Sequence, residues 1–107
     1  MYSRVKAKTF VSITKGTFRT NGLIKDISIG GLSIGTVGSY NPDEIITMNF
    51  KLSNNIAFRN IKGIVKHVEK SMFEAITMGV EFIDFPEDKS KELIEYIDSE
   101  IKANRNK

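Results

Sequence analysis

The sequence contains no cysteine and a single histidine, His67, and these two shortages exclude whole classes of site. Without cysteine there are no disulfides and no thiolate metal sites, and nothing in the chain requires an oxidising compartment. One histidine cannot build a histidine-pair metal site or a facial triad. We therefore expect no resident metal or cofactor, and we interpret His67 as a strand-surface residue.

Long apolar runs are also missing. No stretch approaches the roughly 18 apolar residues that a membrane-spanning helix requires. The N-terminus has no apolar segment before a small-residue cleavage site, which a secretory signal would need. We expect a cytoplasmic protein that does not insert into a membrane.

Catalytic patterns are scarce. Ser28 lies in no G-x-S-x-G elbow, and carboxylate pairs such as Asp43 and Glu44 fall in a loop, where solvation is their ordinary state. Gly30 and Gly35 have the glycine spacing of a phosphate-binding P-loop, but Thr36 stands where the lysine belongs. The sequence gives no support for an enzyme.

What the chain does have is the composition of one soluble domain and an uneven charge. It has 107 residues, of which 40% are hydrophobic and 27% are charged. Residues 1–25 contain six lysines and arginines and no acidic residue, whereas the whole chain carries +3. A basic end beside an acidic remainder favours an anionic partner near that end.

Alternating apolar and polar residues predict six strands with no helix between them. Imperfect alternation around Asn60 and Gly63 indicates a bulge in the fifth strand. Residues 1–8 show no convincing period and are predicted to form a flexible basic arm, and residues 9–107 form one domain. The strands are predicted over residues 9–14, 23–27, 31–35, 44–52, 56–68 and 74–82.

The apolar period changes to a helical one after Pro86. Leu93, Ile94, Ile97 and Ile101 lie at helical spacing, and Glu87 opens the segment as the helix dipole favours. The spacing predicts a helix over about residues 87–103. Six strands without crossover helices predict a mainly β, antiparallel sheet that closes into a barrel, with the helix covering one opening.

The stretch Asp26-Ile27-Ser28-Ile29-Gly30-Gly31 connects two predicted strands and combines short polar side chains with paired glycines. Tight turns between strands use the same residues for purely structural reasons. However, glycine can take positive φ and expose bare backbone to a ligand, and Asp26 and Ser28 reach a ligand with little rotamer entropy to lose. This turn is the candidate ligand-binding segment.

A nucleic-acid-binding barrel is a further reading of the basic end. Phe10, Phe18 and Phe58 are candidates for base-stacking platforms. The segment Lys62-Gly63-Ile64-Val65 lacks the aromatic residues of an RNA-binding RNP1 strand, and we expect the phenylalanines to fill the core. The sequence therefore predicts no nucleic-acid polymer as a partner.

Three features, taken in order, resemble the PilZ domain family over nearly the whole chain. They are a basic Arg4-x-x-x-Lys8 segment, the Asp26-x-Ser28-x-x-Gly31 turn, and the strand Met78-Gly79-Val80-Glu81-Phe82-Ile83-Asp84 leading into a helix. Each motif alone is weak, but the ordered set on an independently predicted barrel is specific. The resemblance implies a split-barrel fold of six strands with a C-terminal helix.

The resemblance also implies a receptor for the bacterial second messenger cyclic di-GMP. In that picture the arm closes over the nucleotide, Asp26 accepts from guanine N1 and N2, and the ordered arm signals to an unidentified protein partner in motility, pilus, secretion or polysaccharide control. The implied ligand-binding residues are Arg4, Lys8, Asp26, Ser28, Gly30 and Gly31.

Lys8 departs from the family pattern, which has a second arginine at this position. Lysine neutralises a phosphate but cannot offer the planar fork that pairs with guanine O6 and N7. Losing one such pair costs about 1 to 3 kcal/mol, which weakens binding without abolishing it. The alternative is a degenerate PilZ module that binds no nucleotide and acts as a protein-interaction adaptor.

Overall fold

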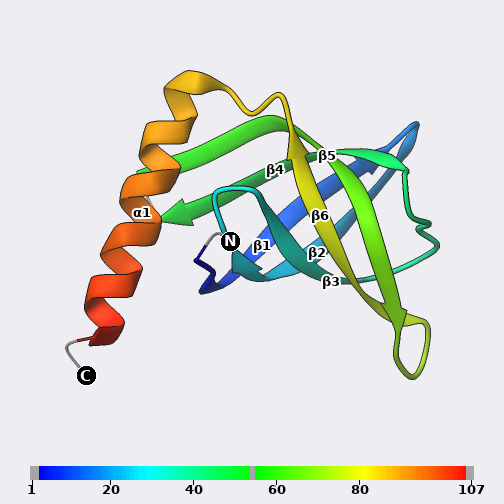
Figure 1. The fold of residues 1–107 in the computed structure, drawn as a ribbon. Helices are drawn as coiled ribbons and strands as arrows, with labels where there is room; N and C mark the ends of the chain where they lie inside the picture. The colour runs from blue at the N-terminus through cyan, green and yellow to red at the C-terminus, as the bar shows by residue number, and fades with distance from the viewer. Residues whose placement is uncertain (1–2, 54, 106–107) are drawn as a thin grey trace.

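The computed structural model describes residues 3–53 and 55–105, which form six strands followed by one helix (Figure 1). All six predicted strands and the predicted helix are confirmed, with the largest change at the start of the first two strands. The elements are β1 (Val5–Lys15), β2 (Phe18–Ile27), β3 (Gly31–Val37), β4 (Ile45–Ser53), β5 (Ile56–Lys70), β6 (Ala75–Ile83) and α1 (Glu87–Arg105).

The strands form a closed barrel in the order β1-β2-β3-β6-β5-β4, and every neighbouring pair is antiparallel. The barrel closes where β4 pairs with β1, from Val11 opposite Phe50 to Thr14 opposite Thr47. Closure pairs the strand edges that would otherwise be open to other chains. The expected closed antiparallel barrel is therefore confirmed.

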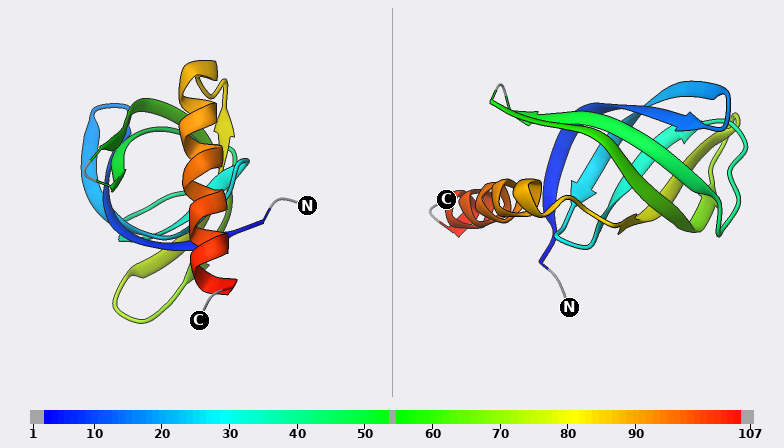
Figure 2. Two further views of the ribbon diagram at one scale, coloured as in Figure 1. Left: turned by 90° about the vertical axis from the view of Figure 1, so that its left-hand side faces the viewer. Right: turned by 90° about the horizontal axis from the view of Figure 1, so that it is seen from above.

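Helix α1 lies across one end of the barrel, as the view along the barrel shows (Figure 2). Leu93 and Ile97 are buried on its inner face and join the core. Phe85, in the loop before the helix, packs against Phe58 in a tilted arrangement, with ring centroids 5.8 Å apart. The helix thus covers the opening as predicted, and within the described residues no helix is long and apolar enough to cross a membrane.

The structure differs from the prediction of a flexible arm at residues 5–8. Strand β1 begins at Val5, which pairs with Ile27, and Lys6 pairs with Asp26. Val5 and Ala7 are buried, so these residues continue the inward-facing row of β1. The alternation of apolar and polar residues was not evident in the sequence here, because Ala7 is small and Thr9 is polar. Residues 1 and 2 of the predicted arm lie outside the described residues.

The phenylalanines divide between the core and the surface. Phe58 is fully buried, as expected, but Phe10 and Phe18 are 79% and 78% exposed. Phe10 points outward because it alternates with buried Val11 along β1, and Phe18 opens β2 directly after the turn that contains Gly16. The prediction that all three fill the core is therefore wrong for Phe10 and Phe18.

The predicted bulge near Asn60 is confirmed. The pairing of β4 with β5 shifts register between Met48 and Phe50, and Asn60 takes a positive φ of 55°. Gly63 lies inside the barrel, where an added Cβ would overlap the Val80 side chain and come within 2.9 Å of the Met48 Cε. The glycine therefore leaves room for the valine and methionine side chains in the core.

Candidate functional site

The turn between β2 and β3 is held by the side chain and backbone of Ser28. The Ser28 amide donates to the carbonyl oxygen of Gly31 over 2.8 Å, which closes the turn. The Ser28 hydroxyl donates to the same carbonyl and accepts from the Gly30 amide, both over 3.3 Å. Ser28 is only 3% exposed. These hydrogen bonds show that Ser28 stabilises the conformation of the turn.

The two glycines of the turn allow close backbone approach, and neither uses positive φ, which occurs at Gly16 and Gly38. A Cβ at Gly31 would overlap the carbonyl oxygen of Val80 on the neighbouring strand β6. The Gly30 carbonyl accepts a hydrogen bond of 2.9 Å from the Phe82 amide. The turn is thereby fastened to β6, and its backbone lies directly beside that strand.

An ion pair joins Arg4 to Asp26, with a hydrogen bond from the Arg4 guanidinium to the Asp26 carboxylate. Arg4 directly precedes β1, and the β1–β2 ladder brings it beside Asp26 near the end of β2. Both side chains are partly exposed. Solvent screens such pairs, so their cations and anions can exchange partners at little cost.

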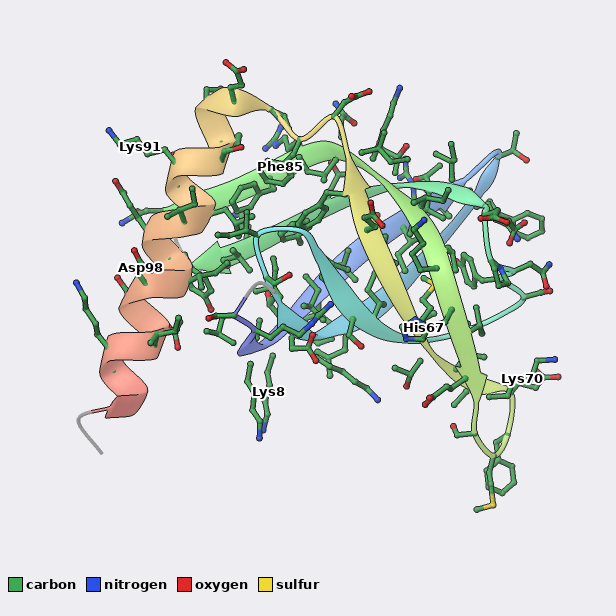
Figure 3. All side chains as sticks on the ribbon, viewed as in Figure 1. Lys8, His67, Lys70, Phe85, Lys91 and Asp98 are labelled. Atoms are coloured by element: carbon green, nitrogen blue, oxygen red, sulfur yellow. The ribbon has the colours of Figure 1, made fainter. Side chains whose placement is uncertain are left out.

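A surface cavity of about 480 Å³ lies beside the turn. It collects four of the six predicted site residues, and Asp26 adjoins it through the ion pair with Arg4. Lys8 does not line the cavity and extends outward from the barrel (Figure 3). The lining residues are Arg4, Ser28, Ile29, Gly30, Gly31, Lys66, His67, Gly79, Val80, Glu81, Phe82 and Phe85.

The wall opposite the turn comes from β5 and β6. His67 on β5 pairs with Gly79 on β6, and a Cβ at Gly79 would come within 2.9 Å of the imidazole Nδ1. The ring therefore lies over the bare backbone of Gly79, where it contributes to the cavity wall (Figure 3). Next to it, Lys66 Nζ lies 3.6 Å from Glu81 Oε2 in a second exposed ion pair.

The sequence patterns did not single out this opposite wall: His67 was considered as a base-stacking residue on a strand beside the site, but a strand-surface role was preferred. The members of the wall come from strands far along the chain from the turn, and only the register of β3, β6 and β5 brings them together. The register shift between Val65 and His67 turns Lys66 and His67 outward in succession. One feature of the sequence could have indicated this wall. A lysine and a histidine, Lys66 and His67, are adjacent in one strand, and the next strand contains Gly79, which has no side chain to cover them.

The arrangement fits a planar, anionic ligand. Two cations, Arg4 and Lys66, stand on opposite sides of the cavity and are held only by exposed ion pairs. Bare glycine backbone and an aromatic ring form the floor and wall between them. Among residues 3–53 and 55–105, no group of three or more His, Cys, Asp and Glu side chains could hold a metal ion.

Comparison with known proteins gives one family and a consistent fold. The family model described as PilZ domain matches residues 1–99. The Bacillus subtilis inhibitor of motility (MotI/DgrA) aligns with a TM-score of 0.77 at 22% identity, over 99% of this chain and 51% of that chain. None of the curated proteins matches the chain.

Two ligand complexes have the same fold. YcgR from Escherichia coli in complex with c-di-GMP gives a TM-score of 0.81 at 14% identity, over 98% of this chain and 47% of that one. The MrkH–c-di-GMP complex from K. pneumonia gives 0.79 at 19% identity, over 99% and 54%. This chain spans about half the length of all three proteins. With the family model matched from residue 1 to residue 99 of 107, the chain belongs to the PilZ domain family.

Proposed function

We propose that this protein is a receptor domain for cyclic di-GMP, bound in the cavity between the β2–β3 turn and strands β5 and β6. The observation that carries the proposal is the convergence of Arg4, Ser28, Gly30 and Gly31 on one cavity, with Asp26 adjoining through its ion pair. Cyclic di-GMP is the ligand of the YcgR and MrkH complexes that share the fold.

The phosphates of the nucleotide would be bound by Arg4 and Lys66. Both cations now face carboxylates, Asp26 and Glu81, and an arriving phosphate competes for them with charge-assisted hydrogen bonds. Because the side chains of both pairs are partly exposed, opening the pairs costs little. The bare backbone of Gly30 and Gly31 leaves room for the sugar-phosphate ring to approach.

Guanine recognition falls to Asp26 once Arg4 has turned toward the ligand. The freed carboxylate accepts from the N1 and N2 donors of guanine, a pairing that other bases do not offer in the same arrangement. His67 supplies a flat ring on the other side of the cavity, against which a base can stack. The ion pair between Arg4 and Asp26 therefore acts as the resting state of the site.

Lys8 remains a predicted phosphate contact. It extends outward next to the register shift of β1 between Lys6 and Thr9, so reaching the ligand requires its flexible side chain to change direction. If it does so, Lys8→Arg adds a planar fork and tightens binding by about tenfold. An unchanged affinity would remove Lys8 from the site.

We further propose that ligand binding signals to a protein partner. Since β1 is already paired from Val5 onward, the change on binding among the described residues concerns Arg4 rather than the strand. The similarity to an inhibitor of motility supports a motility system as the place to look for the partner. Pilus, secretion and polysaccharide control remain further candidates.

Calorimetric titration of the full chain with cyclic di-GMP tests the proposal. Arg4→Ala and Asp26→Asn are each expected to weaken binding by roughly tenfold to a hundredfold, the effect of losing a charge-assisted hydrogen bond. His67→Ala should weaken it by a smaller factor. Arg19→Ala and Asp98→Asn are the matched controls, because neither residue lines the cavity.

If circular dichroism shows a folded chain but titration with high micromolar cyclic di-GMP gives no heat, the result would favour the alternative function, a degenerate PilZ module that binds no nucleotide and acts as an adaptor. Equal losses in Arg4→Ala and Arg19→Ala would show that binding depends on general charge. Either result contradicts the assigned site.

A further inference from the structure

Acidic residues are missing from the strands that form one side of the barrel. Residues 1–25 and 45–68 contain ten lysines and arginines and no aspartate or glutamate. These segments make up β1, most of β2, β4 and most of β5, which are adjacent in the order β2-β1-β4-β5. We call the outward face of these four strands the basic wall, represented by Phe10, Arg19, Leu23, Lys51 and Arg59, all exposed.

Phe10 stands near the middle of the basic wall. It is directly opposite half-exposed Leu23 on β2. On its other side, the β1–β4 ladder stops at Val11, and the Thr9 hydroxyl donates to the Lys51 carbonyl over 2.7 Å. The strands separate here, and a groove of about 360 Å³ opens beside the phenylalanine ring.

The groove combines an exposed aromatic ring with cations. Phe10, Lys51 and Arg59 all line it, together with Asn49. Lys51 lies on β4, the strand next to that of Phe10, and Arg59 lies on β5, one strand further. Among residues 3–53 and 55–105, no carboxylate lies within ion-pair distance of Lys51 or Arg59. Arg59 also lines a second, separate surface pocket, and the acidic residue in the lining of that pocket is Asp88, at the start of α1.

We propose that the basic wall binds single-stranded nucleic acid, with a base stacked on Phe10 and phosphates at Lys51 and Arg59. Proteins that bind single strands without sequence preference combine cations, which contact the phosphates, with exposed aromatic rings. Any base can stack on such a ring, because every base has a π-face. In a duplex both faces of an internal base are already stacked on neighbouring bases, so an exposed ring favours a single strand. The buried position expected for Phe10 was one of two reasons for predicting no nucleic-acid partner, and its exposure removes that reason. The other reason, the lack of an RNP1 strand, applies to RNP1-type RNA-binding domains and not to a ring flanked by cations.

The basic wall is less suited to an anionic membrane. Two of its exposed apolar residues, Phe10 and Leu23, lie in mid-strand among cations rather than at a turn that could enter the lipid, whereas Phe18 lies at the edge of the face, beside the β1–β2 turn. The groove within the basic wall is also separate from the cavity beside the β2–β3 turn, because no residue of the groove lines that cavity. The inference is therefore independent of cyclic di-GMP binding.

Fluorescence anisotropy with labelled dT20 and U20 oligonucleotides, at 50 mM salt and with the full chain, tests the proposal. Phe10→Ala should weaken binding by roughly 5- to 100-fold, the effect of losing one stacked base. The double variant Lys51→Glu, Arg59→Glu should weaken it further and reduce the slope of log affinity against log salt by about 1.4. Lys91→Glu, an outward lysine of α1, is the matched control and should leave binding unchanged (Figure 3).

Three results would overturn the proposal. They are no binding of either oligonucleotide at 100 μM protein, equal weakening by Lys91→Glu, and a Phe10-dependent association with phosphatidylserine vesicles but not with oligonucleotides. The last result would assign the basic wall to a membrane surface. Circular dichroism checks that each variant is folded. Phe10→Ala should bind cyclic di-GMP as the unaltered chain does, so failure of the two proposals can be told apart.

Discussion

Gly31 and Gly35 lie on the same strand, β3, but tolerate a side chain very differently. At Gly31 an added Cβ meets the backbone of β6, at the Val80 carbonyl, which cannot move without breaking the ladder. At Gly35 the nearest atom is the Lys25 Cε, 3.0 Å away, on a flexible side chain. The requirement for glycine in the turn motif is thus a requirement of packing between β3 and β6.

We expect Gly31→Ala to destabilise the fold by at least about 1 to 3 kcal/mol, the usual cost of overpacking. Gly35→Ala should cost less, since Lys25 can move aside. Urea unfolding followed by circular dichroism measures both. Equal stability losses would mean that the β3–β6 contact relaxes more easily than its geometry indicates.

At the residue scale, the sequence predicted one half of the candidate site. The turn residues were visible because Asp26, Ser28 and Gly31 are close in sequence and belong to a recognisable motif. Lys66 and His67 were not, because their place in the cavity depends on strand register and on the missing side chain of Gly79. A lone histidine in a strand has no local feature that distinguishes a site wall from ordinary surface.

Helix α1 contributes to stability through one face. Leu93 is 1% exposed, whereas the next residue, Ile94, is 40% exposed. Leu93→Ala should therefore lower the free energy of unfolding by about 2 to 5 kcal/mol, the range for a buried leucine. Ile94→Ala removes a similar side chain from the surface and should cost well under half as much. Similar losses in thermal or urea unfolding would show that the helix packs differently.

The β5–β6 hairpin has an unfavourable turn. Phe73 and Glu74 have φ values of 62° and 64°, the φ pattern of a type I′ turn, closed by the Ala75 amide donating to the Met72 carbonyl over 3.4 Å. Such turns prefer Asn-Gly, because other residues pay a steric cost in the left-handed region. Phe73 is also 90% exposed, so no packing offsets that cost.

Replacing the turn pair with Phe73→Asn and Glu74→Gly should raise the free energy of unfolding by roughly 1 to 2 kcal/mol. Chemical denaturation of the double variant measures the change. Met72→Asn serves as the control, since Met72 is exposed beside the pair and is not among the residues with positive φ. A destabilised double variant would mean that the phenylalanine ring makes contacts that offset its strain.

At the element scale, period-two alternation predicted every strand because one face of each strand is buried in the barrel. The errors came where inward positions are small or polar, as at Ala7 and Thr9 in β1, and where a turn residue begins a strand, as at Phe18. Outward Phe10 was misassigned for a related reason. Hydrophobicity alone does not say which face of a strand a residue occupies.

The whole molecule is divided by charge. The basic wall contains no acid between residues 45 and 68, whereas α1 carries six acidic residues against four basic ones; the acidic residues are Glu87, Asp88, Glu92, Glu95, Asp98 and Glu100. The cavity beside the β2–β3 turn lies between these extremes, because its two cations each face a carboxylate. The broad basic wall therefore suits a polymer with many phosphates, whereas the cavity, which is nearly neutral, suits a small nucleotide.

This division predicts different salt dependence for the two ligands. A polymer that contacts several cations releases condensed counterions, so its log affinity should fall with log salt with a slope of about −0.7 for each phosphate contact. Cyclic di-GMP has two phosphates and must displace carboxylates that already neutralise Arg4 and Lys66, so its slope should be shallower. Titrations of dT20 and cyclic di-GMP between 50 and 300 mM salt compare the slopes directly. Equal slopes would mean that both ligands are held by the same general charge, and the distinction between the cavity and the basic wall would then be lost.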